Sequence, residues 1–403
     1  MSHKILFINS LYFPYIGGGA EIICQEQVEA FRDRGYDVVV LTTAAKGSEI
    51  TTDEVNGVKV YRAGIKNLYW HFDRNKPNKY KKMAWHIRDM YNSAMKDYLS
   101  NVIRLEKPDV VVCHNITGFS IAIWDEIKKH NLPIVQVLHD QYLRCINSNA
   151  FNKGKECVKQ CLSCRAMRLL HKQKSNKVDV VVGVSHFVLN SLVDAGYFQE
   201  SKKVVIHNAR NIPEIGIKDA WNGEEPLRIG YIGTLSKVKG VEWLIRSFMS
   251  LEINATLTIA GKGESLEYEN FLKKLAELDK RIFFSGYVKA SEHYARIHLS
   301  VVPSLWPDTF PTVAFESCAN HVPVIATKVG GLPEIIKDGV NGLIFNPNDE
   351  FSLEKVILHL TKNPDLLTSL TKASRDSVST MLSAKQMIDS YILHLNNLNL
   401  SIS

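Results

Sequence analysis

The sequence predicts an α/β protein with two doubly wound domains, each a parallel sheet covered by helices. Apolar runs rich in Val and Ile alternate with amphipathic stretches along the chain, a pattern typical of strands buried between helices. This alternation lapses once, over residues 209–226, where prolines and glycines accumulate. The length of 403 residues is what two domains of ordinary size require.

The first domain is predicted to span residues 1–208. Its opening βαβ unit has a strand at Lys4–Asn9, a glycine turn at Gly17–Gly19, a helix at Ala20–Arg34 and a second strand at Val38–Leu41. Because a helix connects the two strands, we expect them to be parallel. Further apolar strands are predicted at Asp109–Cys113, Ile134–Leu138, Asp179–Gly183 and Val204–Ile206.

The second domain is predicted over residues 227–383, after a linker at 209–226. A helix at Val241–Met249 follows its first strand, and residues 384–403 are predicted to form an amphipathic helix and a tail. Its strands are predicted at Arg228–Ile232, Thr256–Ala260, Ile282–Phe284, Leu299–Pro303 and Val322–Ala326.

The bulk composition, 45% hydrophobic and 23% charged, is that of an ordinary globular protein. No apolar run reaches the roughly 18 residues that a membrane span needs. The first residues also lack the long apolar stretch of a signal peptide. We therefore expect a cytoplasmic protein, which leaves contact with a membrane surface open.

The formal net charge of +7 is distributed unevenly. One basic cluster runs from Arg74 to Arg104 and is interleaved with aromatic residues, and a second runs from Lys153 to Lys177. Such a surface suits an anionic membrane, with the protein peripheral on the inner face of the cytoplasmic membrane, or a phosphate-bearing acceptor. A solvated helix face is an equally good interpretation. Nucleic acid is not an expected partner, because no nucleic-acid-binding motif accompanies the charge.

The strongest constellation is a predicted strand, loop and helix that carries two acids. Pro311 is expected near the first helical position, so the free amides of Thr312 and Val313 would point out of the helix toward phosphate oxygens. Glu316, one turn later, can accept hydrogen bonds from ribose hydroxyls, and Asp308 in the loop can hold hydroxyls of a sugar. Acids at such positions are also common for helix-dipole reasons alone.

A second element is the segment Gly233–Gly240, which follows a predicted strand and precedes a helix. Lys239 in this segment places an ammonium group where it can bind a diphosphate and stabilise negative charge on it. A surface lysine before a helix is the alternative. In the first domain, His139 follows the strand Ile134–Leu138, at the edge of the sheet where ligands collect. A histidine bonded to backbone there, with Asp140 capping a helix, is the alternative.

Five segments occur in one order that carries a family resemblance: Gly18-Gly19-Ala20-Glu21, the strand end at His139, Gly233–Gly240, Asp308-x7-Glu316 and Val329–Ile335. In this order the chain resembles retaining glycosyltransferases of family 4 over nearly its whole length. The resemblance implies the GT-B fold, two Rossmann-like domains facing a central cleft, with the C-terminal helix crossing back to the N-terminal domain. It also implies a nucleoside diphosphate sugar donor, bound mainly by the C-terminal domain, and a glycan or lipid-linked acceptor against the N-terminal domain. No divalent metal or other cofactor is implied, and the expected setting is polysaccharide, lipopolysaccharide or glycolipid synthesis.

The resemblance assigns roles to individual residues. The catalytic residues would be His139, Lys239 and Asp308, with His139 near the donor sugar, where it supports an oxocarbenium-like transition state. The donor-binding residues would be Gly18, Gly19, Thr234, Lys239, Phe310, Thr312, Val313 and Glu316.

The chain departs from the family pattern at three positions. Thr234 stands where the family usually has an arginine that binds phosphate, and Lys237 or Lys262 could replace that cation. Asp308 replaces a glutamate, and Pro311 replaces a glycine and removes one amide. These departures support one alternative, a degenerate member that binds a nucleotide or a partner without catalysis. A nucleotide-sugar epimerase of the same fold is a second alternative.

Four of the seven cysteines lie close together in the segment 145–164. Clustered cysteines in a cytoplasmic protein favour metal over disulfides, and four thiolates could hold a structural zinc. Free thiols are the other main interpretation, and an iron–sulfur cluster lacks the sequence context it needs. Cys24, Cys113 and Cys318 are expected to be buried apolar residues. The four clustered residues are Cys145, Cys157, Cys161 and Cys164.

Overall fold

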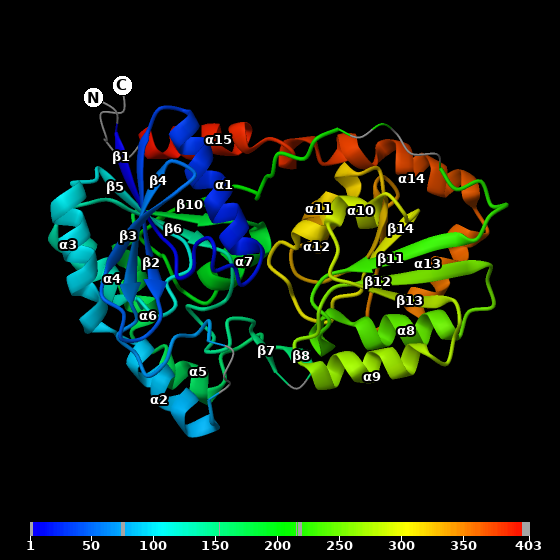
Figure 1. The fold of residues 1–403 in the computed structure, drawn as a ribbon, viewed down its shortest axis with the longest axis horizontal. Helices are drawn as coiled ribbons and strands as arrows, with labels where there is room; N and C mark the ends of the chain where they lie inside the picture. Colours follow the sequence, from blue (N-terminus) through cyan, green and yellow to red (C-terminus); the bar gives the residue numbers. More distant parts are fainter. Residues whose placement is uncertain (1–2, 74–76, 153, 215, 217–219, 397–403) are drawn as a thin grey trace. The chain divides into compact units, whose positions relative to one another are not determined.

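The computed structural model describes residues 3–73, 77–152, 154–214, 216 and 220–396. Arg74, Lys76 and Lys153 of the two basic clusters, parts of the expected linker and the end of the expected tail lie outside these residues. The chain divides into two compact units. Unit 1 comprises residues 1–150, 157–210 and 383–403, and unit 2 comprises residues 151–156 and 211–382. Both units are α/β, as the sequence predicts (Figure 1).

Unit 1 contains an eight-stranded sheet in the order β10-β9-β6-β5-β1-β2-β4-β3, parallel except for β3. The central strand β1 is flanked by β5 and β2, so the direction in which the chain winds reverses at β1. Its strands are β1 (Lys4–Ile8), β2 (Asp37–Ala44), β3 (Thr51–Val55), β4 (Val58–Gly64), β5 (Val110–Cys113), β6 (Ile134–Leu138), β9 (Val180–Gly183) and β10 (Lys202–Val205).

The helices of unit 1 connect and cover these strands. They are α1 (Gly19–Asp33), α2 (Lys79–Asp89), η1 (Ser93–Met95), α3 (Lys96–Glu106), α4 (Ala122–Lys129), α5 (Leu162–Met167), α6 (His171–Lys174), η2 (Ser175–Lys177), α7 (His186–Val193) and α15 (Ala384–Asn396). No helix among the described residues is long and apolar enough to cross a membrane.

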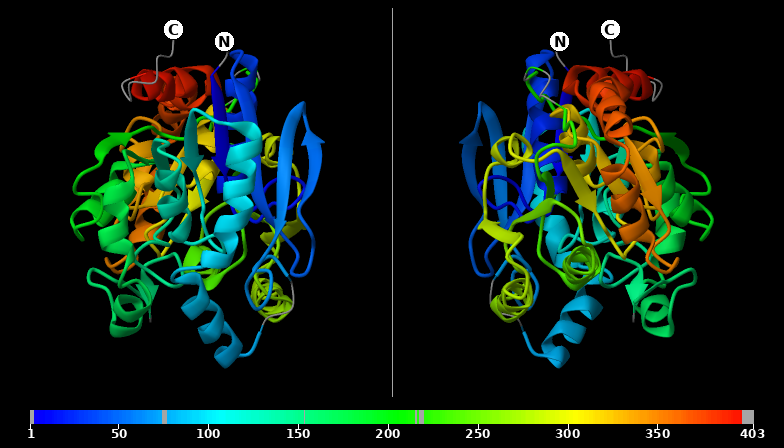
Figure 2. Two further views of the ribbon diagram at one scale, coloured as in Figure 1. Left: turned by 90° about the vertical axis from the view of Figure 1, so that its left-hand side faces the viewer. Right: turned by 90° about the vertical axis from the view of Figure 1, so that its right-hand side faces the viewer.

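The C-terminal helix α15 returns to unit 1 and packs on α1, which confirms the expected crossover (Figures 1 and 2). The rings of Phe31 and Tyr391 lie 6.4 Å apart, and the Arg34 guanidinium lies 2.5 Å from the Asp389 carboxylate. The first and last helices of the chain therefore share one core.

The hairpin formed by β3 and β4 was not predicted. It turns at Asn56 and Gly57, which both have positive φ, 50° and 76°. An Asn-Gly pair between two extended runs favours such a turn, so the sequence did contain the signal. The signal was weak because the residues of β3 are polar and mostly exposed.

Unit 2 contains a six-stranded parallel sheet in the order β13-β12-β11-β14-β15-β16. Counted from β11, this is the Rossmann order 3-2-1-4-5-6, in which ligands bind where the order reverses, outside the carboxyl ends of β11 and β14. The strands are β11 (Leu227–Ile232), β12 (Ala255–Ala260), β13 (Ile282–Gly286), β14 (Leu299–Val302), β15 (Val324–Thr327) and β16 (Gly342–Phe345), the last not predicted.

The core of unit 2 contains Leu227, Leu244, Leu257 and Leu353. The remaining elements of unit 2 are a hairpin of β7 (Phe151–Asn152) and β8 (Lys155–Glu156), then η3 (Lys237–Lys239), α8 (Val241–Met249), α9 (Leu266–Ala276), α10 (Ala290–Tyr294), α11 (Thr312–Ala319), α12 (Leu332–Ile335), α13 (Ser352–Thr361), α14 (Pro364–Ser377) and η4 (Ser379–Met381).

Candidate functional site

The predicted donor residues of unit 2 follow β11 and β14, the two strands at which the strand order reverses. The two loops are bonded to each other, since the Leu305 amide donates to the Val238 carbonyl at 2.8 Å. Gly240 has φ +71°, and a Cβ there would lie 2.0 Å from the Pro303 carbonyl oxygen. Glycine is therefore required at this position, because any side chain would separate the loops.

Lys239 and Asp308, one from each loop, form an ion pair. The two side chains are 26% and 14% exposed, so the pair is accessible from solvent. The Lys239 ammonium also lies 5.4 Å from the centroid of the Trp306 ring, within the range of a cation–π interaction. The structure thus brings two predicted catalytic residues together and fixes the ammonium group between a carboxylate and an indole.

A third loop, after β15, supports Asp308. The Gly331 amide donates to the Asp308 carbonyl at 2.8 Å. Gly330 has φ +58°, and a Cβ there would lie 2.1 Å from the same carbonyl oxygen. The two glycines of the Val329–Ile335 segment therefore have a physical role: they let this loop approach the backbone of Asp308.

The helix α11 begins at Thr312, with Pro311 as its N-cap in an extended conformation (φ −72°, ψ 107°). Pro311 thus lies one position before the helix rather than in its first turn. The first amides of a helix lack intrahelical acceptors and carry the positive end of the helix dipole, so those of Thr312 and Val313 can bind an anion. Glu316 is 7% exposed and lies one turn into the same helix. Phe310 is buried beside Phe315, with ring centroids 6.1 Å apart, and anchors the segment.

Thr234 is exposed at the end of β11, and its carbonyl accepts a hydrogen bond from the Tyr231 hydroxyl at 2.9 Å. Of the two cations that could replace the missing arginine, Lys237 lines a pocket that also contains three glutamates, an unfavourable setting for a diphosphate. Lys262 is exposed in the loop after β12, and this loop is bonded to the β11 loop through the Leu235 amide at 2.9 Å. Lys262 is the better placed of the two.

The glycine run of unit 1 lies between β1 and α1. None of the three glycines has a positive φ, and Gly18 is fully extended, so the turn does not need glycine for its backbone conformation. All three are exposed, and Gly18 donates its amide to Glu21 Oε2 at 2.7 Å. Burial raises the pKa of Glu21. What glycine provides here is bare backbone at the N-terminus of α1, where a ligand can approach closely.

His139 lies directly after β6 and pairs with His114, which lies directly after β5. His139 Nε2 is 2.8 Å from His114 Nδ1, and the two rings are stacked with centroids 5.0 Å apart. Burial lowers the pKa of His139 to about 4 and lowers that of His114 as well, so both rings are neutral near pH 7. The His114 Nε2 is buried without a hydrogen-bond partner among the described residues. His114 directly follows the predicted strand Asp109–Cys113, but its pairing with His139 was not predicted from the sequence.

The backbone after His139 forms turns rather than a helix, so Asp140 caps no helix. Its carboxylate accepts from the Tyr142 amide at 2.7 Å, and burial raises the pKa of Asp140 to about 6. The Tyr142 hydroxyl donates to Asp89 at 2.7 Å, and Asp89 is fully buried, which raises its pKa to about 7. Arg168 lies 4.4 Å from the centroid of the Tyr142 ring. A buried polar network therefore holds the segment after His139 in place.

The zinc interpretation of the cysteine segment is not supported. Among the described residues, which include all four cysteines, no three or more His, Cys, Asp or Glu side chains are grouped so that they could hold a metal ion. Cys145 and Cys164 are buried together beside Cys157, whereas Cys161 is exposed and lies 3.2 Å from the Ser163 hydroxyl. Cys24, Cys113 and Cys318 are fully buried, as expected.

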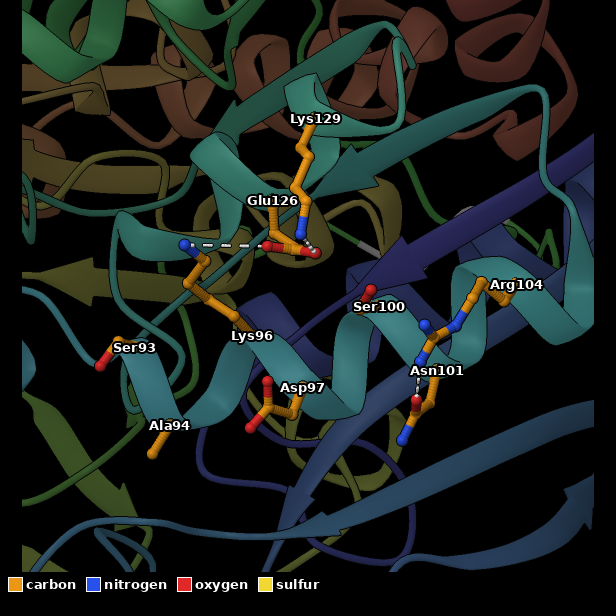
Figure 3. A pocket seen from close by; sticks show the side chains of 9 residues that line it. All are labelled: Ser93, Ala94, Lys96, Asp97, Ser100, Asn101, Arg104, Glu126 and Lys129. Atoms are coloured by element: carbon orange, nitrogen blue, oxygen red, sulfur yellow. Dashed lines mark hydrogen bonds and ion pairs between the residues drawn. The ribbon is translucent and has the colours of Figure 1, made fainter.

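One hollow of unit 1 contains none of the predicted site residues. It has a volume of about 620 Å³ and lies along α3 and the end of α4 (Figure 3). Lys96 and Lys129 both face Glu126 at 3.7 Å, so these charged side chains already pair with one another. We assign no ligand to it.

The two units are the two Rossmann-like α/β domains of a GT-B fold, and comparisons with known proteins give the family. Residues 17–212 match the family described as Glycosyltransferase Family 4, and residues 214–377 match the family described as Glycosyl transferases group 1. An uncharacterized 42.6 kDa protein in the cps region of Klebsiella pneumoniae is 30% identical over 82% of this chain and 87% of its own length. An uncharacterized glycosyltransferase of Methanocaldococcus jannaschii is 28% identical over 87% of each chain.

Solved structures agree with the fold. Sucrose-phosphate synthase from Thermosynechococcus elongatus superposes with a TM-score of 0.75 at 16% identity, over 98% of this chain and 99% of that one. Anabaena HepE in complex with UDP and glucose superposes with a TM-score of 0.72 at 17% identity, over 98% of this chain and all of the other. The chain therefore belongs to the family 4, group 1 glycosyltransferases, and it is an enzyme of that class.

Proposed function

We propose that this enzyme transfers a sugar from a nucleoside diphosphate sugar to a glycan or lipid-linked acceptor with retention of configuration, in the synthesis of a cell-surface polysaccharide or glycolipid. The observation that carries the proposal is the Lys239–Asp308 ion pair at the point where the sheet of unit 2 reverses its strand order. Relatives add support: one lies in a cps region, and one solved neighbour is a lipopolysaccharide outer core galactosyltransferase.

The diphosphate of the donor would lie at the N-terminus of α11. The amides of Thr312 and Val313 would bind its oxygens, and Lys239 would supply the cation. Glu316 would accept hydrogen bonds from the ribose hydroxyls. Asp308 already contacts Lys239, so it can accept from the transferred sugar while it holds the ammonium group in place.

The chemical step breaks the bond between the anomeric carbon and the phosphate oxygen, and it forms a bond from that carbon to the acceptor oxygen on the same face. The acceptor proton passes to the leaving phosphate oxygen. Negative charge grows on the diphosphate as it leaves, and Lys239 and the helix amides stabilise it because they are fixed before the reaction begins.

His139 would act on the sugar as a neutral group. With a pKa of about 4, its ring carries no charge near pH 7 and cannot serve as a general acid there. A neutral ring does not repel a sugar that develops positive charge. His114 helps to orient the ring of His139, because its Nδ1 lies 2.8 Å from Nε2 of His139.

The test combines binding with transfer. Uridine, guanosine and adenosine diphosphate sugars are screened for a rise in melting temperature, and the donor that binds is then assayed with lipid-linked and free glycan acceptors. Lys239→Ala and Glu316→Ala should abolish most of the transfer, whereas Lys237→Ala serves as the matched control. Full activity in both site variants would overturn the assignment. Isomerisation of the donor without an acceptor would instead identify an epimerase. Binding of the donor without any turnover would identify a degenerate member.

A further inference from the structure

The helix α2 directs its apolar side chains toward solvent. It packs on unit 1 through Trp85, His86 and Asp89, and the opposite face presents Tyr80, Met83 and Ile87. These three are 77%, 47% and 55% exposed. Their spacing of i, i+3 and i+7 places them in one stripe along the helix. A surface helix of a globular protein normally has the reverse arrangement.

The charged side chains exposed on α2 are all cationic. Lys79, Lys81, Lys82 and Arg88 are exposed, and the only acid of the helix, Asp89, is fully buried. Within the described part of the chain, none of these four cations forms an ion pair, whereas Lys174 and Lys177 of the second basic cluster both pair with Asp125. The charge of α2 is therefore not neutralised by the fold.

The apolar stripe continues past the helix. Ile87 and Leu170 line one hollow of about 360 Å³, although they are far apart in the sequence. Leu169 beside it is 72% exposed. The surface formed by α2 and Leu169–Leu170, here called the α2 surface, therefore joins two segments of unit 1.

Buried contacts keep α2 in this orientation. The Trp85 indole donates to the Tyr69 carbonyl at 3.0 Å, and Asp89 accepts from the Gly118 amide at 2.8 Å and from the Tyr142 hydroxyl at 2.7 Å. Turning the stripe inward would break all three bonds. The exposed apolar stripe is thus a fixed feature of the folded unit.

We propose that the α2 surface docks on an anionic phospholipid bilayer. Tyr80, Met83 and Ile87 enter the boundary between headgroups and acyl chains, and the exposed cations of α2 bind lipid phosphates. A second copy of the chain is the poorer occupant, because it would bring four more unpaired cations against the first four. The inference is independent of the donor site, and it places the enzyme where a lipid-linked acceptor is held.

Vesicle sedimentation with the full chain and no substrate tests this proposal. Vesicles of phosphatidylcholine with about 30 mol% phosphatidylglycerol should bind the protein, and pure phosphatidylcholine should bind it at least about tenfold more weakly. Added salt should release it, because the charges are exposed. The triple variants Tyr80→Ser/Met83→Ser/Ile87→Ser and Lys79→Gln/Lys81→Gln/Lys82→Gln should each lower binding by about tenfold or more.

The matched control is Leu266→Ser/Leu278→Ser, which removes two leucines of unit 2 that are 80% and 74% exposed but lie beside glutamates. It should bind vesicles like the unchanged protein. All variants should keep the unchanged melting temperature and nucleotide-sugar binding, which separates this test from that of the donor site. The proposal would be overturned if vesicle binding were absent, did not depend on lipid charge or were unchanged in the triple variants. Dimerisation that the apolar triple variant abolishes would also overturn it and would assign the surface to a second copy.

Discussion

The carboxyl-terminal edges of the two sheets are built differently. The edge of unit 2 carries groups of fixed charge, the Lys239–Asp308 pair and the N-terminus of α11, and its glycines bring backbone into close contact. The edge of unit 1 carries the His114–His139 pair, whose rings are both neutral near pH 7 because burial lowers their pKa values. Fixed charge suits an anion such as a diphosphate, and neutral polar groups suit hydroxyls.

This difference predicts where substitutions will matter most. Removing a fixed charge should affect the chemical step directly, because nothing else replaces it. Removing a neutral hydrogen-bonding group should have a smaller effect, since water or a neighbouring group can take its place.

The largest effect is expected for Lys239→Ala. It removes the cation that faces the leaving diphosphate, and it leaves Asp308, which now repels the phosphate, without its partner. We expect kcat to fall by about 10³-fold, the upper range for loss of one pre-organised group at a developing charge. Steady-state kinetics measure this, with Lys237→Ala as the control. A fall of less than about fivefold would show that another cation binds the diphosphate.

A smaller effect is expected for Glu316→Gln. The neutral amide keeps the shape of the side chain but accepts each hydrogen bond from ribose less strongly, by about 1 kcal/mol. Because the ribose is bound alike before and during the reaction, the loss should appear mainly as a donor KM raised by about tenfold or more. A change confined to kcat would place Glu316 at the reacting sugar instead.

The difference between the two sheet edges also determined how much could be predicted from the sequence. The strand and loop pattern of unit 2 was predicted closely, because each of its loops follows an apolar strand and carries its motif within a few residues. The residues Thr312, Val313 and Glu316 belong to one helix turn, so spacing alone brings them together. The role of Gly330 against the Asp308 backbone depends on contact between two loops, which spacing cannot show.

The edge of unit 1 was predicted less completely. His139 was found from its position after a strand, but its partner His114 is 25 residues earlier and no motif connects them. The aromatic residues of the first basic cluster were expected on a surface, yet Trp70 and Trp85 are buried with Leu11 and Ile65. The exposed apolar stripe of α2 depends on which face of the helix is buried, and the sequence alone does not determine that.

An effect of about tenfold is expected for His114→Asn. The shorter amide loses the stacking and the 2.8 Å contact that orients His139. The expected result is a lower kcat with an unchanged donor KM, since His114 acts through His139.

Because the pKa of His139 is lowered to about 4, the rate of the unchanged enzyme should show no titration of His139 between pH 6 and 8. A rate that follows a group of pKa near 6.5, and loses this dependence in the variant, would contradict a neutral His139.

The last expected effect is that of Asp89→Asn, and it concerns stability. Burial raises the pKa of Asp89 from 3.8 to about 7 in the folded protein, so the folded state prefers the protonated carboxyl. This contribution is fully present below pH 3.8 and is lost as the pH rises through 7, where the folded state must hold a buried carboxylate. Asparagine cannot ionise, and its oxygen can still accept from Tyr142 or Gly118. The variant should therefore gain about 2–3 kcal/mol relative to the unchanged protein between pH 5 and pH 8. Urea unfolding at pH 5 and at pH 8 measures the difference.

The variant could instead be less stable than the unchanged protein by the same amount at both pH values. That result would mean that Asp89 is ionised over this whole pH range, and that Arg168, 4.4 Å from the Tyr142 ring, neutralises it.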